Sequence, residues 1–345
     1  MIYLICFIIS LIFLVYILSF ENVVDINLIL LVIIVSIGNG GFYALSCSRN
    51  LEEAIIANSI SYVIGIFAPV TVFRIVCSIC RVHIRKLFLI LEYAVQLVIY
   101  LSVLTIGKTG LYYKTVEYHA GPTVHLTKTY GPMHTAYFVS LILYTLASLI
   151  LGLFFVQKKN VVSRSNVVIV TFVNLLVVGI YIIERLTQLP YELMPVAYVI
   201  SLFVLMIPLI RIYSYSVYDN RTLFAGQIEK TAYIVFDKKG RYMSCSEYAT
   251  TLFPELNSWE LDSPIPGSGG RFNTFLRQPF MNFIHSDEKA DSAGSSYEYR
   301  GEYYHYEIRP ISGNRAKVKG YIIQVSVVTG AIEDSQKGLF NENKQ

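Results

Sequence analysis

The first 215 residues alternate between long apolar runs and short polar connections. An α-helix crosses the apolar core of a bilayer, roughly 30 Å thick, with about 20 residues, and seven runs meet this length. They cover residues 1–20, 27–47, 54–79, 87–107, 135–156, 166–187 and 192–213. The pattern predicts an α-helical membrane bundle of seven transmembrane helices over residues 1–215. The first run lacks the basic start and the cleavage site of a signal peptide, so we expect it to remain as a helix.

From residue 231 the apolar positions recur at every second residue, which is typical of strands. TAYIVF predicts a strand, DKKG a tight turn and RYMSC a returning strand, while SSYEYRGEYYHYEIRP and VKGYIIQVSVVT add three more. EYATTLF and FNTFLRQPFMNFI have the spacing of short helices. We predict a small α+β domain over residues 231–330 with a five-stranded antiparallel sheet. A helical connector is expected at residues 216–230 and the start of a truncated signalling linker at residues 331–345.

Composition agrees with a membrane protein, because 54% of the residues are hydrophobic and only 15% are charged. The net charge of +4 arises within residues 1–219 and is spread over the connections between apolar runs. That distribution indicates a lipid bilayer and no nucleic acid as partner. The five cysteines are an odd number, and Cys77 and Cys80 form a single C-x-x-C without a second pair. We therefore expect no disulfide framework, no metal and no cofactor.

Basic connections set the expected orientation, since cytoplasmic loops carry an excess of Lys and Arg. The basic residues cluster after the third, fifth and seventh runs, which share one side of a seven-helix bundle. They are Arg81, Arg85, Lys86, Lys158, Lys159, Arg164, Arg211 and Arg221. This predicts a multi-pass protein of the plasma membrane with the N-terminus outside and the α+β domain in the cytoplasm.

Two ionisable residues lie inside predicted spans: Arg74 in the third and Glu92 in the fourth. Charges within a span are costly and usually pair or face water. At 1.5 Å per residue, both lie about 9 Å from the cytoplasmic end of their helix. The matching depth predicts an interhelical ion pair. The alternative is that Arg74 extends to the lipid headgroups while Glu92 faces a water-filled space.

The long connection before the fifth run is a second candidate site. It holds His119, His125 and His134 together with Tyr130. Imidazoles on an exposed segment can bind zinc or respond to pH. Their spacings of six and nine residues match no standard zinc pattern. We expect an aromatic lid over the bundle, with these four residues as candidates for sensing at the outer face.

The C-terminal domain resembles a PAS domain. YIVFDKKGRYMSCSEYATTLFPEL is similar to the opening strands and first helix of that family, and YYHYEIRPI with GYIIQVSVVT to its last two strands. FIHSDEK resembles the family's His-Pro-Asp-Asp stretch, with Ser286 in place of proline, and VVTGAIED lacks the usual terminal Asp-x-Thr. The resemblance implies a ligand pocket between sheet and helices. Its candidate lining residues are Trp259, Phe275, Phe280, Phe283 and His285.

The tyrosines of the last strands alternate between the two faces of the expected sheet. They are Tyr297, Tyr299, Tyr303, Tyr304 and Tyr306. One face is expected to cover the core and the other to meet a second copy of the domain. We therefore expect a homodimer through the PAS-like domain or the connector.

Residues 4–219 resemble the seven-helix N-terminal region of bacterial histidine kinases and GGDEF-type diguanylate cyclases. The similarity is most specific at LTKTYGPMHTAYFVSLILYTLASLILGLFF, where Tyr-Gly-Pro precedes the fifth span. It implies a two-component signal-input module that detects an unknown small-molecule or lipid cue, outside the cell or within the membrane, and relays it through the seventh helix to the PAS domain.

The sequence has no GGDEF stretch, no phospho-acceptor helix and no kinase ATP-binding boxes, so no enzymatic activity is predicted for it. One alternative is an N-terminal fragment of a membrane diguanylate cyclase or sensor histidine kinase. The other is a transporter-like bundle with a regulatory domain.

Overall fold

The computed structural model describes residues 1–19, 25–80, 82, 84–121, 124–157, 163–187, 191–214, 231–267, 270–286, 292–312 and 318–327. The chain forms two compact units, Met1–Ile210 and Arg211–Gln345. The predicted connector at residues 216–230 and the linker at residues 331–345 lie outside the described residues.

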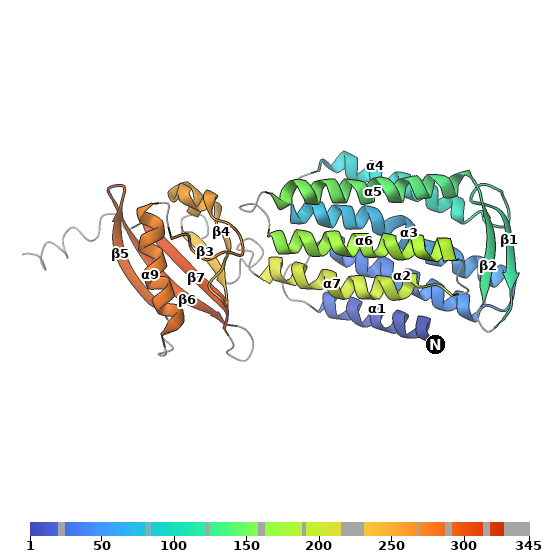
Figure 1. Ribbon diagram of the computed structural model, residues 1–345, viewed down its shortest axis with the longest axis horizontal. Coiled ribbons are helices and arrows are strands. Elements are labelled where there is room, and N and C mark those ends of the chain that lie inside the picture. Colours follow the sequence, from blue (N-terminus) through green and yellow to red (C-terminus); the bar gives the residue numbers. More distant parts are fainter. Residues whose placement is uncertain are drawn as a thin grey trace, which may run out of the picture. The chain divides into compact units, whose positions relative to one another are not determined.

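Each of the seven apolar runs forms an α-helix of the first unit (Figure 1). The helices are α1 (Ile2–Leu18), α2 (Ile26–Cys47), α3 (Leu51–Ile79), α4 (Lys86–Val103), α5 (Pro132–Val156), α6 (Arg164–Thr187) and α7 (Met194–Ser214). Within the described residues, α2 to α6 are long and apolar enough to cross a membrane, whereas α1 and Met194–Ile207 of α7 are shorter apolar helices. The structure thus confirms the apolar helices but not seven full spans.

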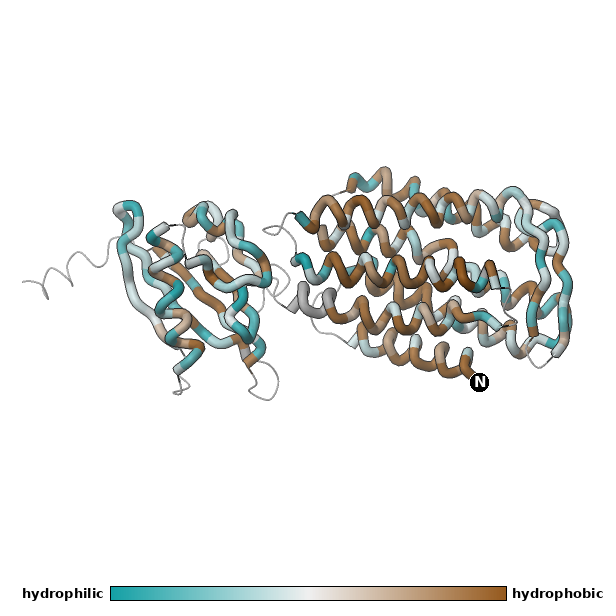
Figure 2. The backbone as a smooth tube through the Cα atoms, in the orientation of Figure 1, coloured by the Kyte–Doolittle hydropathy of each residue, from teal (hydrophilic) through white to brown (hydrophobic). Residues whose placement is uncertain are grey.

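Large apolar side chains cover the outside of this helical unit. Leu87 on α4, Ile150 on α5 and Phe172 on α6 are 75%, 67% and 60% exposed. Figure 2 shows the same apolar character along the helices and a more polar hairpin at one end. Apolar surface of this extent is stable only against lipid or another apolar partner. The helical unit is therefore built for a bilayer.

Helices α2 and α3 pack closely because glycines of α2 face α3. A Cβ on Gly38 would lie 2.6 Å from the Cβ of Ile64, and one on Gly41 would overlap the backbone of Ser61. Small residues allow this close approach between membrane helices, where packing rather than the hydrophobic effect holds helices together. The α2–α3 pair is thus a tightly packed part of the bundle.

A β-hairpin lies at the end of the bundle where the chain begins (Figure 1). Strand β1 (Tyr113–His119) pairs antiparallel with β2 (His125–Tyr130). The Tyr118 hydroxyl donates to the carbonyl of Ser48 at 3.0 Å, which ties the hairpin to the α2–α3 connection. The sequence predicted a lid here without strands.

The second unit contains the expected five-stranded antiparallel sheet. Its strands are β3 (Ala232–Asp237), β4 (Tyr242–Cys245), β5 (Ala293–Tyr299), β6 (Glu302–Ser312) and β7 (Val318–Val327), in the order β4-β3-β7-β6-β5. Between β4 and β5 come α8 (Glu247–Leu252), the 3-10 helix η2 (Pro254–Ser258) and α9 (Arg271–His285). Helix α9 crosses one face of the sheet (Figure 1). Both the strand count and the helical stretches confirm the sequence prediction.

Candidate functional site

The candidate site lies where the hairpin meets the helices, and Tyr130-Gly131-Pro132 forms the junction. The Gly131 N–H donates to the carbonyl of Tyr112 at 2.8 Å. A Cβ on Gly131 would overlap the carbonyl oxygen of Leu111 and lie 2.5 Å from that of Gly110. Pro132 begins α5, at a position where a helix needs no N–H. The glycine therefore permits the close backbone contact that fixes the hairpin against α5.

A cluster of aromatic residues is buried behind this junction. The hydroxyl oxygens of Tyr62 on α3 and Tyr113 on β1 lie 2.5 Å apart, and the ring centres of Tyr62 and Tyr112 are 5.0 Å apart. The buried His134 ring stacks on Tyr130 with a centre distance of 3.9 Å. Burial raises the pKa of Tyr112 and Tyr113 well above the usual tyrosine range. Both hydroxyls therefore stay neutral.

Beside the cluster lies a cavity of about 600 Å³, here called the hairpin-side cavity. Its walls come from α2, α3, β2, α5, α6 and α7 and from the connection between α6 and α7. Ligand sites in proteins commonly measure about 300–1,000 Å³. Its charged lining residues are Lys128, Glu184 and Glu192, and its tyrosines are Tyr62, Tyr130, Tyr137, Tyr181, Tyr191 and Tyr198.

Lys128 and Asn58 form the polar centre of one wall. The Lys128 ammonium donates to the amide oxygen of Asn58 at 3.0 Å and lies 5.7 Å from the centre of the Tyr113 ring. Among the described residues, Lys128 forms no ion pair. Burial lowers the pKa of Lys128, and Glu192 and Glu184 oppose this effect. The site thus contains a cation whose hydration is reduced without a carboxylate in direct contact.

The Asn58 side chain also has unused hydrogen-bonding capacity. Asn58 is only 2% exposed, and its amide nitrogen has no hydrogen-bond partner within the described part of the chain. Burial is the main cause of the raised pKa of Tyr113, and the nearby Asn58 amide opposes that rise. The amide and the Tyr113 hydroxyl nevertheless do not meet hydrogen-bond geometry. The amide nitrogen of Asn58 is therefore a buried donor close to the Tyr113 hydroxyl and the Lys128 ammonium.

Glu184 connects α6 to the first residues of α7. Its Oε1 accepts from the backbone N–H of Leu193 and, at 3.0 Å, from that of Met194. Carboxylates stabilise helix N-termini because the first N–H groups lack partners within the helix. The N–H of Glu192 donates to the hydroxyl of Tyr3 on α1 at 2.9 Å. The cavity wall therefore includes the contacts that hold the start of α7.

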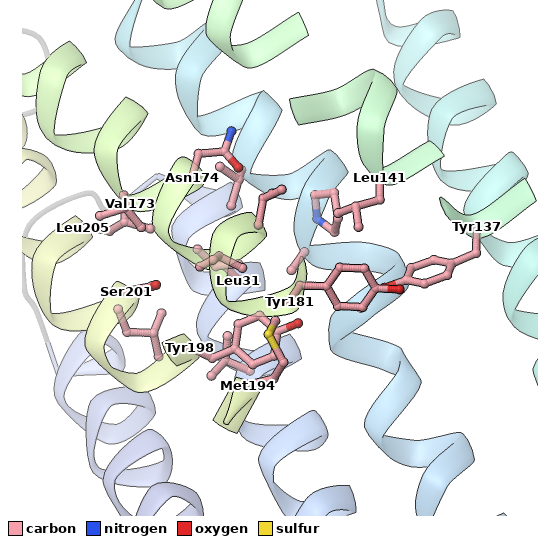
Figure 3. A pocket seen from close by; sticks show the side chains of 18 residues that line it. Leu31, Tyr137, Leu141, Val173, Asn174, Tyr181, Met194, Tyr198, Ser201 and Leu205 are labelled. Carbon is pink, nitrogen blue, oxygen red and sulfur yellow. The ribbon is translucent and has the colours of Figure 1, made fainter. Parts of the chain in front are cut away.

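A narrower space of about 60 Å³, the mid-bundle cavity, lies between α2, α3, α5, α6 and α7 (Figure 3). Its wall is almost wholly apolar apart from Asn174, Ser201 and the tyrosine hydroxyls. Figure 3 shows Tyr198 and Met194 close together, away from Asn174. Both cavities share five lining residues: Gly65, Tyr137, Tyr181, Met194 and Tyr198. The shared tyrosines thus border both a polar space and an apolar one.

The structure brings together only some of the predicted outer residues. Tyr130, His125 and His134 line the hairpin-side cavity, whereas His119 is not part of its lining. The His119 and His125 rings stack with centres 5.0 Å apart at the ends of β1 and β2. Across the described residues, no group of three His, Cys, Asp or Glu side chains could hold a metal ion.

Arg74 and Glu92 lie near one another in the helical unit. The Arg74 Nη1 lies 3.7 Å from the Glu92 Oε2, and the two side chains are 10% and 18% exposed. Neither atom has a hydrogen-bond partner among the described residues. The two charges therefore attract across a short gap without a direct hydrogen bond.

Four of the five candidates in the C-terminal unit belong to its core or pack against it. Trp259 and Phe280 lie within the packed core, and Phe275 stacks on Tyr297 with a centre distance of 3.8 Å. Phe283 is partly buried against the core. His285 is exposed and contacts the carbonyl of Met281 through Nδ1 at 2.8 Å. Trp259 and Phe280 thus belong to the packed core, whereas Phe275 lines an open cavity of about 590 Å³ together with Tyr297.

The tyrosines of the last strands are divided between the core and the exposed surface of the second unit. Tyr299, Tyr304 and Tyr306 are buried in the core, and Tyr297 packs against it. Tyr303, which is 54% exposed, is the one member of the set that projects to solvent. Four of these tyrosines therefore contribute to the core of the domain, and the expected homodimer stays a prediction.

Asn58, Lys128 and Glu184 are not among the candidate site residues predicted from the sequence. The structure places all three on the hairpin-side cavity. A signal was present, since Asn58 lies near the start of α3 and Glu184 near the end of α6, at the same end of the bundle. The path of the hairpin, which brings Lys128 to Asn58, had no comparable signal.

A model of the family described as the N-terminal 7TM region of histidine kinase matches residues 2–217. No curated protein matches the chain.

Three solved structures are similar to the second unit. The PAS domain of the histidine kinase ThkA has 18% identity and a TM-score of 0.22, covering 28% of this chain and 97% of that one. The PAS domain of BvgS from Bordetella pertussis has 16% identity and a TM-score of 0.27, covering 36% and 96%. The PAS domain of a protein from Colwellia psychrerythraea has 14% identity and a TM-score of 0.25, covering 32% and 96%.

Proposed function

Because the chain belongs to the family of N-terminal 7TM regions of histidine kinases, we propose that it is a membrane-embedded signal-input module. A cue binds in the hairpin-side cavity, and the resulting movement of α7 is relayed to the PAS-like domain. Seven spans, with the hairpin outside the cell and the PAS-like domain in the cytoplasm, are part of this proposal. The basic residues expected on the cytoplasmic side lie at or after the ends of the third, fifth and seventh apolar runs in the sequence.

The observation that carries the proposal is the contact between Glu184 and the start of α7. This carboxylate both lines the cavity and accepts from the first backbone N–H groups of α7. A ligand that changes the position or hydrogen bonds of Glu184 therefore acts directly on α7. Any such ligand shifts the balance between bundle arrangements by the difference in its affinity for them.

The test replaces Glu184 in the full chain, reconstituted in lipid nanodiscs. Glu184→Ala removes a contact of the helix-capping kind, each worth about 0.5–2 kcal/mol. Glu52→Ala is the matched control, because Glu52 is exposed in the first turn of α3 at the same end of the bundle. Hydrogen–deuterium exchange is then followed in α7 and in β3 of the PAS-like domain.

We expect Glu184→Ala to increase exchange at the start of α7 and to change exchange in β3, while Glu52→Ala changes neither. Faster exchange in α7 with unchanged exchange in β3 would show that the helix does not relay its state to the domain. That result would refute the proposed relay.

A further inference from the structure

We propose that the hairpin-side cavity binds a small carboxylate with an apolar body. The carboxylate lies at Lys128 and Asn58, and the apolar body extends past Tyr181 and Tyr198 toward the mid-bundle cavity. This inference rests on the proposed function and adds the chemical class of the cue and its orientation.

The donors at one wall identify the charged group. The Lys128 ammonium makes one hydrogen bond, to Asn58, and no ion pair among the described residues. The Asn58 amide nitrogen, buried next to it, has no partner in that same set. These two neighbouring donors, one of them cationic, match the two oxygens of a carboxylate. Hydrogen bonds in which one partner is charged are stronger than those between neutral groups. A bound anion would also favour the charged form of Lys128, because it opposes the lowering of the Lys128 pKa by burial.

The shape of the space identifies the rest of the molecule. The hairpin-side cavity, about 600 Å³, has room for a small organic ligand, and its tyrosines also border the apolar mid-bundle cavity. Val173, Leu202 and Leu205 line the mid-bundle cavity and offer only apolar contacts. A ligand that is polar throughout would make no favourable contacts with the apolar lining of the mid-bundle cavity. An apolar body gains free energy by leaving water.

The remaining charges distinguish two sources of such a carboxylate. The Glu184 carboxylate accepts hydrogen bonds from the backbone at the start of α7. Glu192 is the other carboxylate that lines the cavity, and it is half-buried. A fatty acid of short chain uses only the Lys128 wall. A free apolar amino acid would place its ammonium group toward Glu192.

Binding is measured by equilibrium dialysis with the full chain in phosphatidylcholine nanodiscs. The probes are radiolabelled octanoate and leucine, and octylamine and octanol serve as competitors that lack a carboxylate. Variants Lys128→Met and Asn58→Asp test the donor pair. Asn58→Asp is nearly isosteric and supplies Lys128 with an internal carboxylate, so it stays informative if Lys128→Met folds poorly. Lys114→Met is the matched control, because Lys114 is an exposed lysine of β1.

We expect octanoate or leucine to bind with one site per chain and neither competitor to displace it. Loss of a charge-assisted hydrogen bond lowers affinity by about 10-fold or more, so both donor-pair variants weaken binding while Lys114→Met does not. Weaker leucine binding in Glu192→Gln, with octanoate unchanged, identifies the amino acid as the source. The proposal is overturned if neither probe binds, or if Lys128→Met and Lys114→Met bind equally.

Trp259 separates this inference from the proposed function. It is the single tryptophan of the chain and lies in the core of the PAS-like domain. If a probe binds but Trp259 fluorescence does not change, the carboxylate site is supported and the relay to the PAS-like domain is refuted. If no probe binds but Glu184→Ala changes exchange in β3, the relay stands and the ligand class is rejected.

Discussion

Neutralising Arg74 and Glu92, singly and together, tests whether their approach is an energetic interaction. The Arg74 Nη1 and Glu92 Oε2 are 3.7 Å apart, and both side chains are mostly withdrawn from the surface. Arg74→Met and Glu92→Gln each remove one charge at similar side-chain size. Each single variant leaves the other charge without its partner, whereas the double variant leaves no charge at all.

The structure sets the size of the expected effect. Two unit charges at this distance attract by about 4 kcal/mol at an effective dielectric constant of about 20. Desolvation of both groups offsets much of this attraction, and the pair lacks a direct hydrogen bond. We therefore expect each single variant to lower the free energy of unfolding by about 2–4 kcal/mol. The double variant should cost less than the sum of the two by about 1–3 kcal/mol.

The assay is reversible unfolding of the full chain in bicelles, analysed as a double-mutant cycle. Lys86→Met combined with Glu92→Gln is the control cycle, because Lys86 is exposed at the start of α4. The two changes in the control should add. A coupling of less than about 0.5 kcal/mol between Arg74 and Glu92 lies within ordinary additivity and would refute the ion pair.

Three further substitutions test local packing. Gly131→Ala should lower the melting temperature of the full chain, because the new Cβ overlaps a loop carbonyl oxygen; an unchanged melting temperature would mean that the junction yields freely. Asp237→Ala should destabilise the PAS-like domain by about 2–4 kcal/mol, since its carboxylate accepts from two backbone N–H groups and from the guanidinium of Arg241. Urea unfolding followed by Trp259 fluorescence measures this loss, and a change below about 0.5 kcal/mol would contradict it. Asn273→Leu should cost about 1–3 kcal/mol in the same assay by leaving the indole N–H of Trp259 unpaired. Equal stability would show that the indole finds another acceptor.

The two strands of the hairpin have a local sequence pattern that favours strands, and the lid prediction does not use it. YKTVEYH and HLTKTY are rich in Thr and Tyr, which favour strands, and Gly121 between them suits a turn. The segment lies between apolar runs and was interpreted as a lid. Its pairing brings Lys128 onto Asn58 across 70 positions of sequence, and no local preference specifies that contact.

The PAS-like domain shows a different limit of sequence reasoning. The period of two predicted all five strands, because one face of the sheet must be apolar to cover a core. Whether that core is packed or hollow depends on how side chains from distant elements fit together. Phe253 of the α8–η2 segment and Phe272 of α9 stack with centres 4.2 Å apart, and both belong to the packed core.

The sequence by itself determined the seven apolar helices, the five-stranded sheet and the depth match of Arg74 and Glu92. Each of these follows from a period, a length or a rise per residue, which are properties of the local chain. Only the tertiary structure decided that Asn58, Lys128 and Glu184 share one cavity, and that Trp259 and Phe280 lie in the packed core of the second unit. Convergence of side chains from separate elements depends on register and packing, which arise only when the whole unit is assembled.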